Sequence, residues 1–284
     1  YPAVKLSFTK MHGCGNDYIY FNAFTQSIHN PEELSIRLSQ RRKSIGGDGI
    51  ILVCPSDAAD AKMRIFNADG SEAKMCGNGV RCVAKFVVDQ GLVPSDRETV
   101  AIDTLSGVKT IRLLRENGQV VGATVDMAQA ILTPKEIPVL LEGDRVIGRP
   151  VEIAGKSWDI TCVSMGNPHC VVFVDQVENL NLEQLGPCFE KNPIFPEQVN
   201  TEFIRVLDPH TLQMRVWERG SGETWACGTG ACAAAVAAVE NGYCLKNEDI
   251  TVHLVGGDLV IRYTDQTVYM TGEAVTAFEG EVEV

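Results

Sequence analysis

Residues 67–79 read Asn67-Ala68-Asp69-Gly70-Ser71-Glu72-Ala73-Lys74-Met75-Cys76-Gly77-Asn78-Gly79, and a related stretch returns at an offset of 151 as Glu218-Arg219-Gly220-Ser221-Gly222-Glu223-Thr224-Trp225-Ala226-Cys227-Gly228-Thr229-Gly230. One glutamate, the cysteine and two of the glycines are identical in the two copies. Each copy follows a strand-like run and leads into an apolar segment at helical spacing, 80–88 or 231–239. The sequence therefore predicts a cysteine at the start of a helix, twice.

The same offset relates residues well outside these two stretches. Gly15-Asn16 corresponds to Gly166-Asn167, and Gly91 corresponds to Gly242. A chance match does not hold one register through a turn, a strand, a loop and a helix, so we infer an internal duplication. We expect an N-terminal domain at 1–126, joined by the C-terminal segment 275–284, and a second domain at 127–274.

Each half contains several strand-like runs and one very apolar helix. A helix that is apolar all round is buried, so each half should wrap its sheet around that helix. We predict an α+β fold of two pseudo-symmetric domains, each a mostly antiparallel sheet around a central helix, with the active site in the cleft between them. Locally, Asn30 and Pro31 should open a helix to about Gln40, and a helix at 77–90 should end before Gly91.

Composition excludes several classes of protein. The net charge of −12 over 284 residues argues against nucleic-acid and anionic-membrane partners, because both need a cationic face. No apolar run approaches the roughly 20 residues that span a bilayer. Ten scattered cysteines without a Cys-x-x-Cys pair indicate neither a disulfide framework nor a zinc site. With no secretory signal at Tyr1-Pro2-Ala3-Val4, we expect a cytoplasmic protein, or a plastid stromal one if a transit peptide has been removed.

The two cysteines suggest a reaction. A helix N-terminus carries about half a positive charge, which should stabilise a thiolate and lower the pKa of the thiol. The flanking glycines let an anion approach the backbone N–H groups. Two such sites on opposite walls can invert a carbon centre, since one thiolate removes a proton from one face and one thiol supplies a proton to the other. The pair titrates as a coupled unit.

A packing role is the alternative for a cysteine before glycine at a helix start. Gly-Asn-Gly alone is also a weak phosphate-loop signal, without the lysine of a P-loop or the spacing of a dinucleotide site. The second copy favours function, because the cysteines and their glycines persist between halves that otherwise diverged.

Further motifs make the chain resemble the diaminopimelate epimerase family over nearly its whole length. They are His12-Gly13-Cys14-Gly15-Asn16-Asp17-Tyr18, Ser164-Met165-Gly166-Asn167-Pro168-His169, Trp217-Glu218-Arg219-Gly220 and Tyr269-Met270-Thr271-Gly272. The resemblance implies an isomerase that needs no cofactor and no metal and interconverts LL- and meso-diaminopimelate for lysine and peptidoglycan synthesis. A homodimer is compatible with it.

The resemblance also implies roles for individual residues. Cys76 and Cys227 match the acid/base pair, and His169 and Glu218 match positions that support catalysis. The substrate-binding set comprises Asn16, Asn67, Gly77, Asn78, Asn167, Asn200, Glu218, Arg219, Gly228 and Thr229.

The chemistry of the substrate agrees with this set. Arg219 can bind a distal carboxylate with its fork of donors, and Glu218 can hold an ammonium group. The alternatives are a surface ion pair for Glu218 and Arg219, a turn histidine for His169, and a loop residue for Asn200.

Two positions depart from the family pattern, and two other functions remain open. Gly49 stands where some members carry glutamine, and Cys14 where many carry an aliphatic residue. A proline racemase or hydroxyproline epimerase also uses two cysteines as its acid/base pair, but it usually has histidine in place of Asn78. A non-catalytic amino-acid-binding protein on the same fold is the alternative from another class.

Overall fold

The computed structural model describes residues 3–284, which form two compact units. Of the described residues, the first unit comprises those up to Val125 together with Thr271–Val284, and the second is Asp126–Met270. The boundaries that we infer from the sequence repeat, after 126 and after 274, differ from these by one residue and by four residues.

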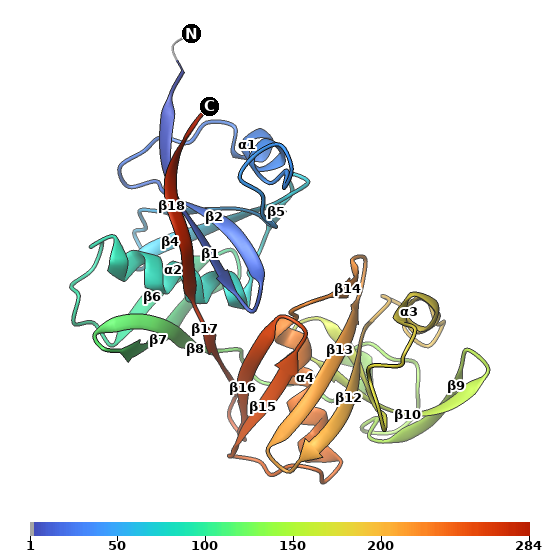
Figure 1. The fold of residues 1–284 in the computed structure, drawn as a ribbon. Coiled ribbons are helices and arrows are strands. Elements are labelled where there is room, and N and C mark those ends of the chain that lie inside the picture. The colour runs from blue at the N-terminus through green and yellow to red at the C-terminus, as the bar shows by residue number, and fades with distance from the viewer. Residues whose placement is uncertain (1–2) are drawn as a thin grey trace. The chain divides into compact units, whose positions relative to one another are not determined.

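The first unit holds the elements of the N-terminal copy and the last strand of the chain (Figure 1). In chain order they are β1 (Lys5–Gly13), β2 (Asn16–Asn22), α1 (Pro31–Leu38), β3 (Gly49–Cys54), β4 (Ala61–Asn67), β5 (Glu72–Ala73), α2 (Gly77–Asp89), β6 (Thr99–Thr104), β7 (Gly107–Glu116), β8 (Gln119–Asp126) and β18 (Val275–Glu283).

The second unit repeats this order. Its elements are η1 (Pro134–Glu136), β9 (Arg149–Ile153), β10 (Lys156–Ser164), β11 (Pro168–Phe173), α3 (Leu182–Glu190), β12 (Asn200–Asp208), β13 (Thr211–Glu218), β14 (Gly222–Thr224), α4 (Gly228–Glu240), β15 (Asp249–Leu254), β16 (Gly257–Tyr263) and β17 (Val268–Glu273), which runs across the second boundary. Helices α2 and α4 begin and end at the offset of 151 found in the sequence.

The strands of each unit pair in the same pattern. In the first unit β18, β1, β2, β3, β4, β6, β7 and β8 pair in that order, and only β2–β3 and β4–β6 are parallel. In the second unit the strands pair in the order β9, β10, β11, β12, β13, β15 and β16. Of these pairs, β11–β12 and β13–β15 are parallel. The predicted α+β class with mostly antiparallel sheets is confirmed.

The central helix of each unit is enclosed by that unit's strands (Figure 1). Helix α2 contacts β1, β2, β3, β4, β6 and β7, and α4 contacts the equivalent strands β10, β11, β12, β13, β15 and β16. Strand residues alternate between core and surface, as in β6, where Val100, Ile102 and Thr104 are buried. Along α4 every residue from Gly230 to Ala238 is buried, as its run of alanines predicts.

Three local expectations need correction. Helix α1 ends at Leu38, two residues before the predicted Gln40, and Asn30 makes no side-chain cap because its backbone is left-handed, with φ of 49°. Helix α2 is not apolar throughout, since it buries the charged side chains of Arg81 and Lys85. It ends at Asp89, and Gly91 follows with φ of 69°, the left-handed conformation that commonly terminates a helix.

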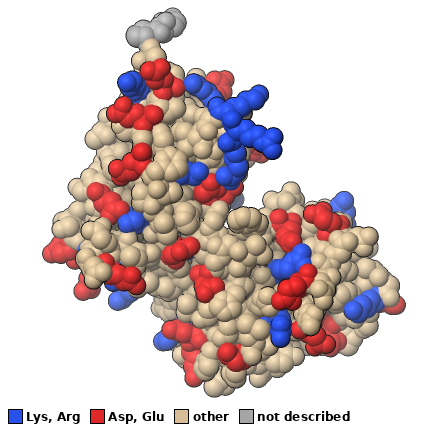
Figure 2. Space-filling model, viewed as in Figure 1, with Lys and Arg blue, Asp and Glu red and all other residues tan. Residues whose placement is uncertain are grey.

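Acidic side chains are spread over both units on the face in Figure 2, whereas several basic ones gather at the upper right of the first unit. Among residues 3–284, no helix is both long enough and apolar enough to cross a membrane.

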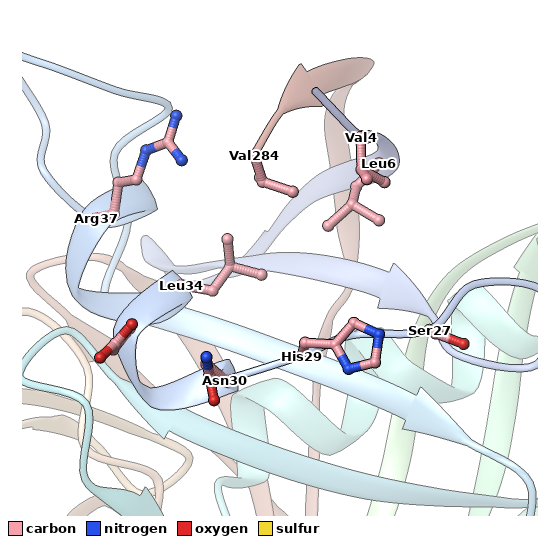
Figure 3. Close-up of a pocket in the computed structure, with 9 residues that line it drawn as sticks. Val4, Leu6, Ser27, His29, Asn30, Leu34, Arg37 and Val284 are labelled. Carbon is pink, nitrogen blue, oxygen red and sulfur yellow. The ribbon is translucent and has the colours of Figure 1, made fainter. Parts of the chain in front are cut away.

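A cavity of about 340 Å³ lies in the first unit between α1 and the paired ends of β1 and β18 (Figure 3). Leu6, Leu34 and Val284 contribute apolar walls, and Arg37 and His29 contribute polar ones. None of the residues that line it belongs to the site inferred from the sequence.

Candidate active site

Each repeated cysteine is the N-cap residue of the central helix in its own unit. Cys76 has φ of −142° and ψ of 120°, and Cys227 has φ of −125° and ψ of 104°. Both backbones are therefore extended directly before the helix, as the duplication predicts. The first N–H groups of α2 and α4 have no acceptor in the preceding turn of helix, so both cysteines lie at the positive end of a helix dipole.

Three groups contact the sulfur of Cys76. The thiol donates to Oδ1 of Asn16 at 3.1 Å. The sulfur accepts from the N–H of Gly79 at 3.4 Å and from the hydroxyl of Tyr18 at 3.9 Å. The first contact suits a thiol, whereas the other two suit a thiolate, so this environment can serve both protonation states.

The amide of Asn16 is oriented from its far end. Its Nδ2 donates to Oδ2 of Asp48 at 2.7 Å, which turns Oδ1 toward Cys76. Asp48 also accepts from the N–H of Asp17 at 3.0 Å, and Asp17 pairs with Lys10 and Arg41. Burial acts to raise the pKa of Asp17, but its hydrogen bonds to Arg41 and Lys10 outweigh burial and hold the pKa at about 2. Burial raises the pKa of Asp48.

Arg81 fixes the first turn of α2 from within the core. Its side chain donates to the carbonyl of Gly77 at 3.1 Å, to Oδ1 of Asn78 at 2.7 Å and to the carbonyl of Glu273 at 3.2 Å. The second end of the Asn78 amide donates to Asn16 at 3.3 Å. Since both ends of this buried amide are occupied, Asn78 offers a ligand its backbone N–H rather than its side chain.

In the second unit a chain of polar side chains leads to Cys227. Nε2 of His169 contacts Oδ1 of Asn167 at 3.0 Å, and Nδ2 of Asn167 donates to Oγ1 of Thr229 at 3.2 Å. That hydroxyl lies 3.7 Å from the sulfur of Cys227. On its other side, Nδ1 of His169 lies 2.5 Å from Oε1 of Glu202, which is fully buried.

The remaining predicted residues of this unit lie around the β13–β14 turn. Glu218 accepts from the hydroxyl of Thr224, and burial raises the pKa of the Glu218 carboxyl. Asn200 accepts from the N–H of Arg219 at 2.8 Å and donates to the carbonyl of Pro168 at 2.9 Å. Asn200 thus joins two loops of the site with both ends of its amide.

Arg219 is exposed, and its guanidinium donates to the carbonyl of Glu197 at 2.9 Å. No ion pair between Glu218 and Arg219 occurs within residues 3–284. The alternative of a surface ion pair is therefore wrong.

The expectation that the helix ends lower the pKa of the cysteines is wrong. Burial raises the pKa of Cys76, although the N–H of Gly79, the hydroxyl of Tyr18 and the charge of Arg81 act to lower it. Burial also raises the pKa of Cys227, and the carboxyls of Glu218 and Glu202 raise it further. Desolvation of the thiolate therefore outweighs the hydrogen bonds that act to lower the pKa in both units.

The structure gathers the predicted residues into two groups. Asn16, Gly77 and Asn78 surround Cys76, while Asn167, His169, Gly228 and Thr229 surround Cys227. Asn67 lies apart from these contacts at the end of β4, where its Nδ2 donates to Ser71 at 3.1 Å. In the described part of the chain, no cluster of three or more His, Cys, Asp or Glu side chains is arranged to hold a metal ion.

The chain is also similar in sequence to known proteins over nearly its whole length. Over residues 8–133 and 161–277 the chain matches the model of the family described as Diaminopimelate epimerase. A protein of that name from Desulfovibrio desulfuricans is 52% identical, over 98% of this chain and 99% of its own length. Another from Methanococcus maripaludis is 50% identical, over 98% of this chain and 100% of its own.

The chain belongs to the diaminopimelate epimerase family. It is therefore an enzyme of the isomerase class, and the activity of the family is the epimerisation of diaminopimelate.

Solved structures share the fold of this diaminopimelate epimerase family member. A hydroxyproline epimerase from Agrobacterium vitis with bound trans-4-hydroxy-L-proline superposes with a TM-score of 0.68 at 13% identity, over 99% of this chain and 93% of that one. A phenazine biosynthesis protein of the PhzF family from Bacillus anthracis superposes with a TM-score of 0.67 at 16% identity, over 99% of this chain and 100% of that one. At such identities the likeness shows the fold alone.

Sequence reasoning missed four residues at this epimerase site, namely Tyr18, Asp48, Arg81 and Glu202. The available signal was a charged residue in an apolar run, as with Arg81 in α2, whereas Glu202 follows the polar Asn200 and Thr201 and carries no such signal. At Gly49 a Cβ would lie 2.0 Å from the carbonyl oxygen of Phe66. This position therefore contributes backbone only.

Proposed function

We propose that the chain interconverts LL- and meso-diaminopimelate without a cofactor, with Cys76 and Cys227 as the two bases. The observation that carries the proposal is the equivalent placement of both cysteines as N-caps of equivalent helices, each within its own set of hydrogen bonds. One base for each face of the carbon is what inversion requires.

The steps conserve protons. A thiolate removes the α-proton from one face of the carbon and becomes a thiol, and the other thiol gives its proton to the opposite face and becomes a thiolate. The intermediate carbanion places charge on the adjacent carboxylate. The N–H groups of Gly77 and Asn78 in one unit, and of Gly228 and Thr229 in the other, are the donors that we assign to stabilise that charge.

The raised pKa values suit this chemistry. A carbon-bound α-proton is weakly acidic, and a thiolate of higher pKa is a stronger base toward it. The two environments are also unequal, because the charge of Arg81 acts to lower the pKa of Cys76 whereas two carboxyls raise that of Cys227. We therefore assign the thiolate of the resting pair to Cys76 and the thiol to Cys227.

The substrate carries a second amino-acid group, and the second unit offers partners for it. Arg219 is exposed, and one of its N–H groups is bound to a backbone carbonyl, so we assign it to the distal carboxylate. Glu218 is assigned to an ammonium group. Asn16, Asn67, Asn167 and Asn200 complete the set, with Asn200 acting through the loops that it joins.

Two experiments test the proposal. With diaminopimelate in D₂O, the enzyme should exchange the α-proton and interconvert the epimers, while proline should show no exchange. Cys76→Ala and Cys227→Ala should each lose epimerisation by at least about a thousandfold, since one face lacks its base. Cys188→Ala, at the exposed cysteine of α3, is the matched control and should retain activity. Exchange on proline, or turnover by either active-site variant near that of the control, contradicts the assignment.

We extend the proposal to a reducing compartment, the bacterial cytoplasm or the plastid stroma. Within residues 3–284 none of the ten cysteines forms a disulfide, and both proposed bases must remain thiols to react. Sedimentation of the purified chain tests whether it forms the homodimer that the family resemblance allows.

A further inference from the structure

The two units carry different residues at two equivalent positions close to the cysteines. At the offset of 151, Tyr18 corresponds to His169 and Ile51 to Glu202. A Cβ at Gly79 would meet Cδ1 of Ile51 at 3.0 Å, and a Cβ at the equivalent Gly230 would meet Oε1 of Glu202 at 2.9 Å. The second unit thus places a carboxyl group where the first unit places a methyl group.

Glu202 is buried, and no Lys or Arg side chain of residues 3–284 forms an ion pair with it. Its side chain is 0% exposed, and its one ion-pair partner among residues 3–284 is His169. Oε2 is buried and has no hydrogen-bond partner in the same part of the chain. An ionised carboxylate in such a place is costly unless a proton or a charge compensates it.

The hydrogen bonds of His169 determine where that proton lies. Nε2 faces Oδ1 of Asn167, an oxygen that can only accept, so Nε2 carries a hydrogen. The 2.5 Å contact between Nδ1 and Oε1 of Glu202 then holds one further proton, either on the oxygen or on the nitrogen. In both forms the Glu202–His169 pair is neutral overall, and loss of that proton makes it an anion.

We propose that Glu202 is a positioning residue for Cys227: it shares one proton with His169, which fixes the ring toward Asn167, and the charge of the pair controls the ionisation of the Cys227 thiol. The proposal rests on the proposed function in so far as Cys227 reacts with the substrate. The statement that a titrating Glu202–His169 pair lies beside this thiol is supported by the interatomic contacts and does not depend on the proposed function.

Distance and charge make the coupling strong. The position of a Cβ on Gly230 lies 2.9 Å from Oε1 of Glu202 and 3.0 Å from the sulfur of Cys227. These two atoms are therefore at most about 6 Å apart. A charge at that range shifts a pKa by about one unit or more. Burial raises the pKa of Glu202 to about 7, with His169 acting to lower it and Glu218 to raise it.

Other titratable groups also face this carboxyl and belong in the analysis of any pH profile. They are Glu218 on β13, Cys227 before α4, and Cys170 on β11, which pairs with Cys162 on β10.

The test is the pH dependence of alkylation at Cys227 in the ligand-free full chain, with iodoacetamide as the probe and each cysteine read by mass spectrometry. In the wild type we expect two inflections, one near pH 7 from the pair and one from the thiol itself. In Glu202→Gln the first inflection should vanish and the second should fall by about one unit or more, because no anion remains beside the sulfur. Glu240→Gln, at the far end of α4, is the control and should match the wild type.

Two further measurements keep the outcome decisive. Glu202→Ile installs the residue of the first unit and should behave as Glu202→Gln does, so it replaces that variant if glutamine impairs folding. In the wild type, the ¹³C signal of the Glu202 carboxyl should change near pH 7, and a signal constant from pH 6 to 8 overturns the proposal. Identical alkylation profiles in folded wild type and variant also overturn it. Turnover by Cys227→Ala is scored separately and bears on the proposed function alone.

Discussion

A methyl group added at Gly230 probes how tightly Cys227 is packed, and Gly79 provides the matched control in the other unit. In Gly230→Ala the new Cβ lies 3.0 Å from the sulfur of Cys227 and 2.9 Å from Oε1 of Glu202. In Gly79→Ala it lies 3.6 Å from the sulfur of Cys76, and its nearest contact is a terminal methyl of Ile51 at 3.0 Å. Neither substitution changes the residues whose backbone N–H groups we assign to the substrate, Gly77 and Asn78 in one unit and Gly228 and Thr229 in the other.

The magnitudes follow from these contacts. Alanine in place of glycine inside a helix stabilises it by roughly 0.5–1 kcal/mol. Overpacking against groups that cannot move costs about 1–3 kcal/mol. We therefore expect Gly230→Ala to lose about 1–2 kcal/mol of unfolding free energy, and Gly79→Ala to be near neutral because the Ile51 methyl can rotate away.

The effect on activity should be larger at Gly230. Displacing a reacting group by 1 Å can cost about 100-fold in rate, so a shift of a few tenths of an ångström at Cys227 should lower kcat/KM by about tenfold. Urea unfolding and epimerisation rates of both variants measure the two effects. Equal stability and equal activity in the two alanine variants refute the packing on which the second half of the site depends.

Three further outcomes follow from the hydrogen bonds and charges of the site. Arg81→Met removes three hydrogen bonds, one to a buried and two to part-buried acceptors, and should cost about 2–3 kcal/mol in urea unfolding. Alkylation of this variant should show a higher pKa for Cys76, because a neighbouring positive charge is gone. Asn200→Ala should raise KM for diaminopimelate more than it lowers kcat, since the loop of Arg219 loses its support; an unchanged KM contradicts that role. Asp17 has a depressed pKa of about 2, so its contribution to stability is present above about pH 4 and is lost as the pH falls toward 2. Unfolding of Asp17→Asn should therefore show less loss of stability between pH 5 and pH 2 than unfolding of the wild type.

The elements that the sequence predicts well are those with strong local signals. Helix α4 is a run of small apolar residues after a cysteine and glycines, and its repeat as α2 fixes both starting points. The end of α1 and the cap at Asn30 were missed because they depend on the left-handed backbone of Asn30 and on contacts with β3 and β4, which no local pattern encodes.

The residues of the site also differ in whether a local sequence pattern could reveal them. Cys76 and Cys227 stand out because they are duplicated, whereas Glu202 was missed because its partner His169 is 33 residues away and reaches it through the parallel pairing of β11 and β12. The direction of the cysteine pKa values was also wrong. A helix N-terminus is visible in the sequence, but the burial that outweighs it is a property of the packed unit.

Exchange of the α-proton by the two single-cysteine variants tests the central claim most directly. In D₂O, the Cys227 thiol that remains in Cys76→Ala can ionise, remove the proton from one face of the carbon and, after exchange with solvent, return deuterium to that same face. We expect each variant to label one epimer of diaminopimelate without inverting it, and the two variants to label opposite epimers. Labelling of the same epimer by both variants, or inversion by either, contradicts an arrangement with one base for each face.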